Sequence, residues 1–283
     1  MKNLADGRTF ITVSRSPGVP ASLHTISNKF DNSSGPLLIP YPNWAAYKNP
    51  AACQGITSVY RITIDQCNRL WVLDDGKIGD EKICTAQLLV YDLKSDEVIF
   101  KIEIPDKIAQ NEQGKSLLVK PVIEIIENRC NNVTAYIADM GGHGLIVWNN
   151  NRLTRFENKL FDPEPQNADI TIAGETLHLL EGILGLALTP KEFFNGDRLL
   201  FFKSLASRSI YSVPVRELKS TNHQGRIQFY GSIDVLSSQA TAMTFSSDGT
   251  LFYGLPEDTA IGCWNLKKPF ESKNLVSAFC LIT

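Results

Sequence analysis

The sequence predicts an all-β protein, a β-propeller of four-stranded blades. Three observations favour this fold class: hairpins of apolar strands recur, their turns are rich in Asn, Asp and Gly, and long helical periodicity is absent. With Trp71, Tyr136, Leu200 and Phe252 taken as equivalent, the repeat intervals are 65, 64 and 52 residues. Two hairpins per interval make a four-stranded sheet, which is a propeller blade. An unrelated β-sandwich, which also has many short strands, is the alternative.

The first hairpin of each blade gives the clearest signal. Four such hairpins lie at residues 58–74, 121–139, 182–202 and 241–253. Asn, Asp and Gly suit their turns because these residues tolerate positive φ. Residues 87–93 and 98–104 form the second hairpin of a blade. Residues 145–148 are the first strand of the corresponding hairpin in the next blade. Lys191 to Phe194 are expected to form a turn of helix.

The two ends of the chain predict an incomplete ring. Residues 10–13 fit the second strand of an earlier blade, whose first strand is missing or cut short. Phe252 ends the series of five such strands, with only about 30 residues beyond it. We therefore expect residues 1–283 to form a single, partial propeller domain with an unpaired edge.

Composition and charge exclude several classes of protein. The chain has 28 basic and 30 acidic residues and a formal net charge of −2, with no basic block, so nucleic-acid binding is not expected. No apolar run approaches the roughly 18 residues that a membrane span needs. No apolar segment follows Met1, so no signal peptide is visible.

Cysteines and sequons favour an oxidising compartment. The chain has six cysteines without a CxxC pair and four scattered histidines, which argues against a zinc site. Asn32 and Asn132 begin sequons, which accept glycans only in the secretory pathway. A truncated N-terminus would reconcile these features with the missing signal peptide.

Segments over nearly the whole chain resemble the insect Yellow and major royal jelly protein family. They are residues 17–23, 38–44, 53–59, 65–74, 137–139, 144–147, 181–188 and 260–265. The resemblance implies a six-bladed propeller, secretion, and a role in pigmentation, royal jelly or saliva. Family members normally begin with a signal peptide and continue well past the CWN element at 263–265. We therefore expect a chain truncated at both ends, with its sixth blade largely missing.

The blade pattern also predicts disulfides. Cys67 and Cys130 occupy the same turn position in adjacent blades, whereas Cys53 and Cys84 open strands at the opposite face. The hypothesis is therefore a Cys67–Cys130 and a Cys53–Cys84 bridge. Cys263 and Cys280 could pair or be left over, and buried free thiols are the alternative throughout.

A propeller binds ligands at one mouth of its central channel. We expect this mouth to include Gln54, Asp74, Asp75, Asp139, Met140, His143, Glu181, Ser204 and Gln239. Of these, the predicted ligand-binding residues are Gln54, Asp74, Asp139, His143, Glu181 and Gln239. Carboxylates in a partly enclosed site can hold an ammonium group. For each residue the alternative is capping or turn formation in a loop.

The resemblance implies two functions. Some salivary members of the family bind amines such as serotonin and catecholamines in this mouth, which favours a secreted amine-binding or pigmentation-pathway protein without turnover. Other members convert dopachrome, a reaction that needs a general base, and His143 beside Asp139 is the candidate. A solvated loop histidine is the alternative reading of His143.

Catalytic and cofactor motifs are absent from the sequence. It contains no GxSxG, HExxH, GxxxxGK[ST] or GxGxxG pattern. The calcium-like run at 74–77 lacks further oxygen ligands, and the glycines at 141–144 are interpreted as a turn between strands. We therefore expect no metal and no cofactor, and the sequence does not predict an oligomeric state.

Overall fold

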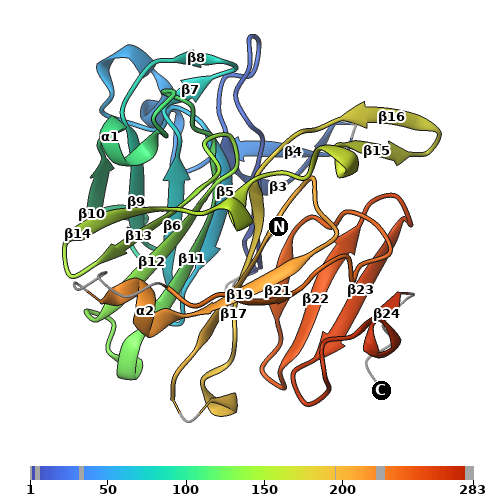
Figure 1. Ribbon diagram of the computed structural model, residues 1–283. Helices are drawn as coiled ribbons and strands as arrows, with labels where there is room; N and C mark the ends of the chain where they lie inside the picture. The colour runs from blue at the N-terminus through green and yellow to red at the C-terminus, as the bar shows by residue number, and fades with distance from the viewer. Residues whose placement is uncertain (1, 4–6, 32–34, 195, 221–226, 278–283) are drawn as a thin grey trace. The chain divides into compact units, whose positions relative to one another are not determined.

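The computed structural model describes residues 2–3, 7–31, 35–194, 196–220 and 227–277 (Figure 1). The chain divides into two compact units. The first comprises 1–110 with 117–134, and the second 111–116 with 135–283. The expected single domain stays a prediction, and we describe each unit by itself.

The first unit contains two complete four-stranded antiparallel sheets. One has the strand order β1-β2-β3-β4, with bounds Lys2–Asn3, Thr9–Thr12, Leu23–Asp31 and Gly35–Pro40. The other has the order β10-β9-β6-β5, with β5 at Val59–Ile64, β6 at Arg69–Asp74, β9 at Ala86–Asp92 and β10 at Glu97–Ile104. A small hairpin of β7 (Lys77–Ile78) and β8 (Glu81–Lys82) lies between β6 and β9 in the chain.

The boundary between the units falls in the third sheet. Its order is β11-β12-β13-β14, with bounds Leu118–Ile125, Val133–Asp139, Gly144–Asn149 and Arg152–Glu157. The turn between β13 and β14 has positive φ at Asn150 and Asn151. That geometry suits a tight two-residue hairpin and is why asparagine stands there.

The second unit continues with two further four-stranded sheets and one hairpin. The sheet β17-β18-β19-β20 has the bounds Ile183–Leu188, Leu199–Ser204, Ile210–Pro214 and Tyr230–Ser232. The sheet β21-β22-β23-β24 has the bounds Met243–Phe245, Thr250–Leu255, Ala260–Asn265 and Val276–Ser277. The hairpin pairs β15 (Asp169–Ile172) with β16 (Glu175–His178).

Helices are few and short among the described residues. The α-helices are α1 (Asp106–Ala109) and α2 (Val215–Lys219). The 3-10 helices are Trp44–Tyr47, Pro50–Ala52, Ile126–Asn128, Lys159–Phe161, Pro165–Asn167, Lys191–Phe193 and Ser272–Asn274. The turn of helix predicted near Lys191 is therefore confirmed.

The expected hairpins are confirmed and the blade count is corrected. Trp71, Tyr136, Leu200 and Phe252 all lie in the second-numbered strand of a hairpin, in β6, β12, β18 and β22. The prediction of six blades with the last largely missing is wrong for this chain. The described residues form five four-stranded sheets, and β24 gives the last of them its fourth strand. Strands of two residues, such as β1 and β24, are too short to show an alternating pattern.

Each unit has its own apolar core. In the first, buried side chains of neighbouring sheets pack together, among them Phe10, Leu23, Val72 and Tyr91. In the second, Phe201, Met243, Leu251 and Trp264 belong to one cluster. Residues that alternate along a strand point to opposite faces, so each sheet contributes to packing on both faces.

Both predicted disulfides are confirmed, Cys53–Cys84 and Cys67–Cys130. Cys263 is disulfide-bonded as well, whereas Cys280 lies outside the described residues.

A polar cluster surrounds the Cys67–Cys130 bridge. The Asp65 carboxylate accepts hydrogen bonds from Cys67 N (2.8 Å), Arg69 Nε (2.8 Å) and Trp71 Nε1 (2.7 Å). Arg69 also donates to the carbonyl oxygen of Cys130 over 2.7 Å. Segment 65–74 therefore has a structural role: its hydrogen bonds hold the turn after β5, the Trp71 indole and the backbone on both sides of the disulfide in place.

Candidate functional site

Asp74, the last residue of β6, is a fully buried anchor. Its carboxylate accepts hydrogen bonds from Thr57 N (2.7 Å), Ser58 N (2.8 Å), Gly76 N (3.0 Å) and Gln87 Nε2 (2.9 Å). Burial raises the pKa of this carboxyl, and the four N–H donors oppose that rise. Asp74 thus ties the loop before β5 to the end of β6.

Asp75 directly follows this anchor in the chain, whereas Gln54 precedes it by 20 residues, and the two side chains differ in exposure. Gln54 is exposed, whereas Asp75 is buried and accepts a hydrogen bond from Lys77 N over 3.2 Å. Burial raises the pKa of Asp75 to about 7, and the negative charge of Asp74 adds to that rise. Asp75 therefore titrates in the neutral range.

Asp139, the last residue of β12, is also fully buried. One carboxylate oxygen accepts from Gly142 N (2.9 Å) and the other from Arg155 Nη1 (2.8 Å). Arg155 Nη2 closes the cluster by donating to the Gly142 carbonyl over 2.7 Å. A Cβ at Gly142 would overlap Asp139 Oδ2, so only glycine fits here. The glycine-rich run thus turns the chain around a buried ion pair.

Glu181 and His143 form the accessible part of the candidate site in the second unit. Glu181 is half-buried, and burial raises the pKa of its carboxyl; His143 opposes the rise and Asp139 adds to it. The His143 side chain is 31% exposed, and its Nδ1 lies 3.4 Å from Asp162 Oδ1. Gly182 N donates to the Met140 carbonyl over 3.0 Å, which places Glu181 beside the turn that carries His143.

His143 therefore has a different carboxylate partner from the one expected. The sequence placed it beside Asp139, whose two oxygens are instead bound by Gly142 and Arg155. Asp162 follows a 3-10 helix 19 residues further along, and only folding brings it to the imidazole.

Gln239 is buried and joins loops within the second unit. Its Nε2 donates to the carbonyl oxygens of Asn167 (2.8 Å) and Asp169 (2.9 Å). Ser204, also expected at the mouth, is buried and donates to the Phe161 carbonyl over 2.9 Å. Both side chains hold the backbone of neighbouring segments.

The sequence did not single out Lys203, which lies fully buried in β18. Its Nζ donates to the carbonyl oxygens of Ser204 (2.6 Å), Ser207 (3.0 Å) and Ala240 (2.9 Å). Burial lowers the pKa of Lys203 to about 7, and the charge of Glu164 opposes that change. The sequence feature that could have indicated this buried charge is a lysine within the otherwise apolar strand at 199–204.

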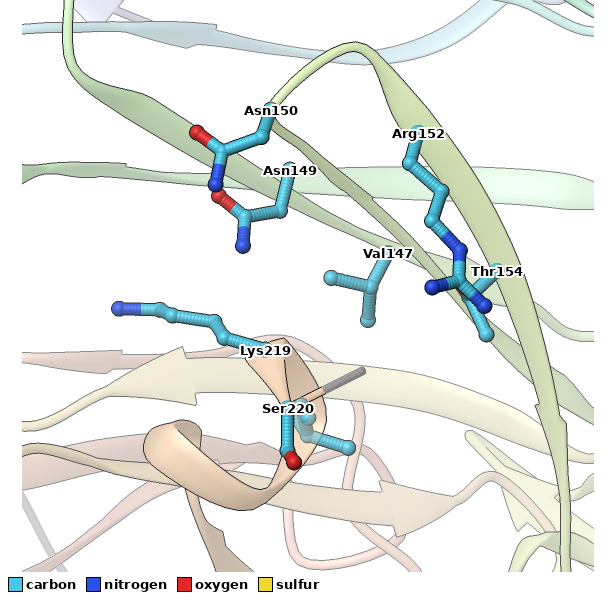
Figure 2. Close-up of a pocket in the computed structure, with 8 residues that line it drawn as sticks. Val147, Asn149, Asn150, Arg152, Thr154, Lys219 and Ser220 are labelled. Atoms are coloured by element: carbon cyan, nitrogen blue, oxygen red, sulfur yellow. The ribbon is translucent and has the colours of Figure 1, made fainter. Parts of the chain in front are cut away.

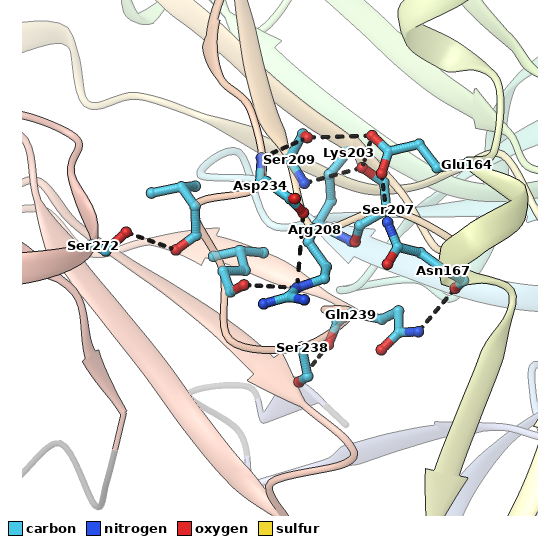
Figure 3. A network of polar contacts seen from close by, with 12 residues as sticks. Glu164, Asn167, Lys203, Ser207, Arg208, Ser209, Asp234, Ser238, Gln239 and Ser272 are labelled. Atoms are coloured by element: carbon cyan, nitrogen blue, oxygen red, sulfur yellow. Dashed lines mark hydrogen bonds and ion pairs between the residues drawn. The ribbon is translucent and has the colours of Figure 1, made fainter.

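Glu164 lies in the same polar network (Figure 3). Its Oε1 accepts from Ser207 Oγ (2.9 Å) and Ser209 Oγ (3.2 Å), and its Oε2 accepts from Asn167 Nδ2 (2.6 Å). With Lys203 and Gln239, it ties the loops that precede β15, β19 and β21 to one another.

The predicted ligand-binding residues thus fall into two groups. Asp74, Asp139 and Gln239 are buried with protein partners, which is the arrangement of loop anchors. Gln54, His143 and Glu181 retain exposed surface. Only Asp139, His143 and Glu181 are brought together within one unit.

One of the two predicted glycan acceptors lies among the described residues. Asn132 lies partly exposed in the turn before β12, and Asn32 lies outside the described residues. Among the described residues, no group of three or more His, Cys, Asp or Glu side chains could hold a metal ion. No helix within the same residues is long and apolar enough to cross a membrane.

Repeated four-stranded antiparallel sheets, with polar residues at the ends of their strands, define a protein of the β-propeller class. Residues 57–278 match the major royal jelly protein family. The chain belongs to that family.

Relatives from Apis mellifera support this assignment. Major royal jelly protein 9 is 41% identical over 95% of this chain and 63% of its own length. Major royal jelly protein 7 is 40% identical over 94% of this chain and 59% of its own length. The chain thus spans about three fifths of the length of these relatives.

A solved structure supports the fold alone. Hydrazine synthase of Kuenenia stuttgartiensis matches 93% of this chain and 70% of its own chain, with a TM-score of 0.54 and 8% identity. At that identity the likeness concerns the backbone arrangement and carries no information on activity.

Proposed function

We propose that this chain is a secreted protein that binds a small amine of the catecholamine or serotonin type without turning it over. Glu181 is the proposed anchor for the ammonium group. Membership of a family named for royal jelly and the disulfides Cys53–Cys84 and Cys67–Cys130 support secretion, because disulfides persist in oxidising compartments.

Charge balance in the second unit favours Glu181. Of the two carboxylates of this unit that the sequence predicted at the mouth, Asp139 is neutralised by Arg155, which leaves the half-buried Glu181 to receive a cation. The observation that carries the proposal is the accessible position of this carboxyl beside the turn that carries His143, and its raised pKa supports it. A bound ammonium group would stabilise its charged form and lower that pKa.

Calorimetric titration of the chain with dopamine and serotonin tests the proposal. We expect saturable binding near one equivalent, at least tenfold weaker in Glu181→Gln, which keeps the shape and removes the charge. Glu175→Gln on β16 is the matched control, because it removes one exposed acidic charge elsewhere in the same unit. Equal affinities in Glu181→Gln and the wild type would refute the assignment.

Proton release gives a second readout. If the ammonium group lowers the pKa of Glu181, binding releases protons at any pH where the free carboxyl is partly protonated, and the apparent heat there changes with the ionisation enthalpy of the buffer. Glu181→Gln removes this dependence. If the buffer dependence persists in Glu181→Gln, the released proton does not come from Glu181, and the amine is held at another site.

The second candidate function is dopachrome conversion. The contact between His143 and Asp162 favours it, because a carboxylate can orient an imidazole toward a substrate proton. His143→Ala should then slow dopachrome decay. His178→Ala is the matched control, since His178 also contacts an aspartate, Asp169, over 2.7 Å and is more exposed. Equal decay rates with and without protein argue against turnover.

Secretion also predicts a glycan at Asn132. Chain expressed in a secretory host should lose mass on treatment with an N-glycosidase, and Asn132→Gln should remove the contribution of that site. An unchanged mass in Asn132→Gln would refute modification there.

A further inference from the structure

Two surface features lie outside the candidate site. The first is a pocket in the second unit between the β13–β14 hairpin and α2, with Asn149 and Asn150 on one side and Lys219 and Ser220 on the other (Figure 2). Asn149, Lys219 and Ser220 have interaction partners within the protein, so half of the polar residues in the wall of this pocket are already engaged. The second feature, in the first unit, is an exposed apolar patch on β10.

Three consecutive apolar side chains form this patch on β10, an edge strand of its sheet (Figure 1). Val98 is 48% exposed, Ile99 52% and Phe100 41%. Side chains normally alternate between the two faces of a strand, so three neighbours at the surface need a local cause. The register supplies it, because Val98 pairs with Tyr91 and Phe100 with Val90, which makes Ile99 the extra residue of a β-bulge.

The patch is separate from the apolar core of the first unit. Ile102 and Ile104, further along the same strand, are buried, whereas Val98, Ile99 and Phe100 are at least two fifths exposed. Edge strands of soluble proteins are usually protected by charged residues, and adjacent apolar side chains at an edge are typical of an interaction surface.

Opposite charges bound the patch. Glu97 precedes Val98, Lys101 follows Phe100, and both charged side chains are exposed. Lys101 Nζ lies 3.1 Å from Glu103 Oε1, but this ion pair is exposed and contributes little, and an ammonium group has further N–H donors for a second carboxylate. Residues 97–101 thus have the order acidic, three apolar, basic, which is complementary to the same segment running in the opposite direction.

We propose that β10 is the contact surface between two copies of this chain, related by a two-fold axis at Ile99. In this antiparallel arrangement Ile99 meets its own equivalent, Val98 meets Phe100 of the second copy, and each Glu97 meets Lys101 of the other copy. A shift of the register by two residues places Glu97 against Glu103 in one direction and against Ile99 in the other. The charges therefore favour a single register.

The bulge limits the strength of this contact. It disrupts the row of backbone N–H and C=O groups along the edge of β10, so the contact depends mainly on side chains. A standard stable interface buries about 1,600 Å² and roughly 20–30 residues on each side, which is far more than residues 97–101 provide. We therefore expect a weak, reversible dimer that is populated only at high protein concentration.

Sedimentation velocity of the oxidised 1–283 chain over a series of concentrations tests the proposal. Glu97→Lys and Lys101→Glu each place like charges against each other across the two-fold axis, so each should weaken self-association at least tenfold. An equimolar mixture of these two variants should associate again with nearly the affinity of the wild type, because every charged contact between the two different chains then joins opposite signs. A contact elsewhere on the surface would not give this pattern.

Ile99→Asp tests the centre of the contact. It places two carboxylates at the axis and should abolish association. Ile39→Asp is the matched control, because Ile39 is 51% exposed on β4, the edge strand of the other complete sheet in the same unit, and its replacement should leave association unchanged. The substituted side chains are all exposed, so we expect every variant to melt within a few degrees of the wild type, which circular dichroism checks.

Four results would overturn the proposal. They are a wild-type chain that stays monomeric up to its solubility limit, charge variants that associate like the wild type, a mixture of Glu97→Lys and Lys101→Glu that does not recover association, and a loss in Ile39→Asp equal to that in Ile99→Asp.

Discussion

Removal of the Cys67–Cys130 disulfide should destabilise the chain by about 4 kcal/mol. The bridge joins residues 63 apart, and closing a loop of that length lowers the entropy of the unfolded chain by about 14 cal/mol/K. Multiplied by 298 K, this gives about 4 kcal/mol. Cys130 is exposed and Cys67 partly so, and the double variant Cys67→Ala/Cys130→Ala therefore removes little buried apolar surface.

Urea unfolding under oxidising conditions measures the loss. Trp71 is 1% exposed and bonded to Asp65 beside the bridge, so its fluorescence reports on the turn that the bridge closes. The comparison is Cys53→Ala/Cys84→Ala, whose bridge spans 31 residues and contributes about 0.6 kcal/mol less through loop closure, although loss of the buried Cys84 side chain adds to the cost of this variant. A loss below about 1 kcal/mol for Cys67→Ala/Cys130→Ala, with an unchanged denaturant dependence, would refute the loop-entropy reasoning.

Three further predictions concern buried charges. Arg155→Met leaves the Asp139 carboxylate buried without its cation and should cost about 3–5 kcal/mol in urea unfolding; adding Asp139→Asn should recover part of the loss, and additive losses would contradict the coupling. Lys203→Met removes the donor to three carbonyl oxygens and should destabilise the second unit by about 2–4 kcal/mol, whereas an unchanged midpoint would contradict a structural role. Because burial raises the folded pKa of Asp75 to about 7, the stability contributed by its protonated carboxyl is full below about pH 4 and is lost as pH rises to 7; Asp75→Asn should abolish that pH dependence and stabilise the chain at pH 8 by on the order of 4 kcal/mol, and parallel pH profiles would contradict it.

Local patterns predicted much of the framework. Short apolar runs and the Asn, Asp and Gly turns placed β6, β12, β18 and β22, because both signals act over a few neighbouring residues. The disulfides followed as well, since equivalent turn positions in repeated blades lie close together. The sequence showed five second strands but not that the first and last sheets are complete, because the completing strands β1 and β24 have two residues each.

The roles of the polar residues depended on tertiary structure. Asp139 and Glu181 looked alike as carboxylates at the mouth, yet Arg155 binds only the first of them. Lys203 obtains one of its three acceptors from Ala240, 37 residues away. Whether a side chain anchors a loop or meets solvent depends on which distant segments pack against it, and no local pattern encodes that.

The sequence by itself therefore determined the fold class, the first hairpins of the blades and the disulfide pairs, because short-range periodicity and repeated turn positions specify them. Only the tertiary structure decided that Asp74, Asp139 and Gln239 are buried anchors and that Glu181 stays accessible. It also decided that Asn149, Arg152 and Lys219 line one pocket. Burial and charge pairing arise from contacts between segments far apart in the chain, and these form only when the sheets pack.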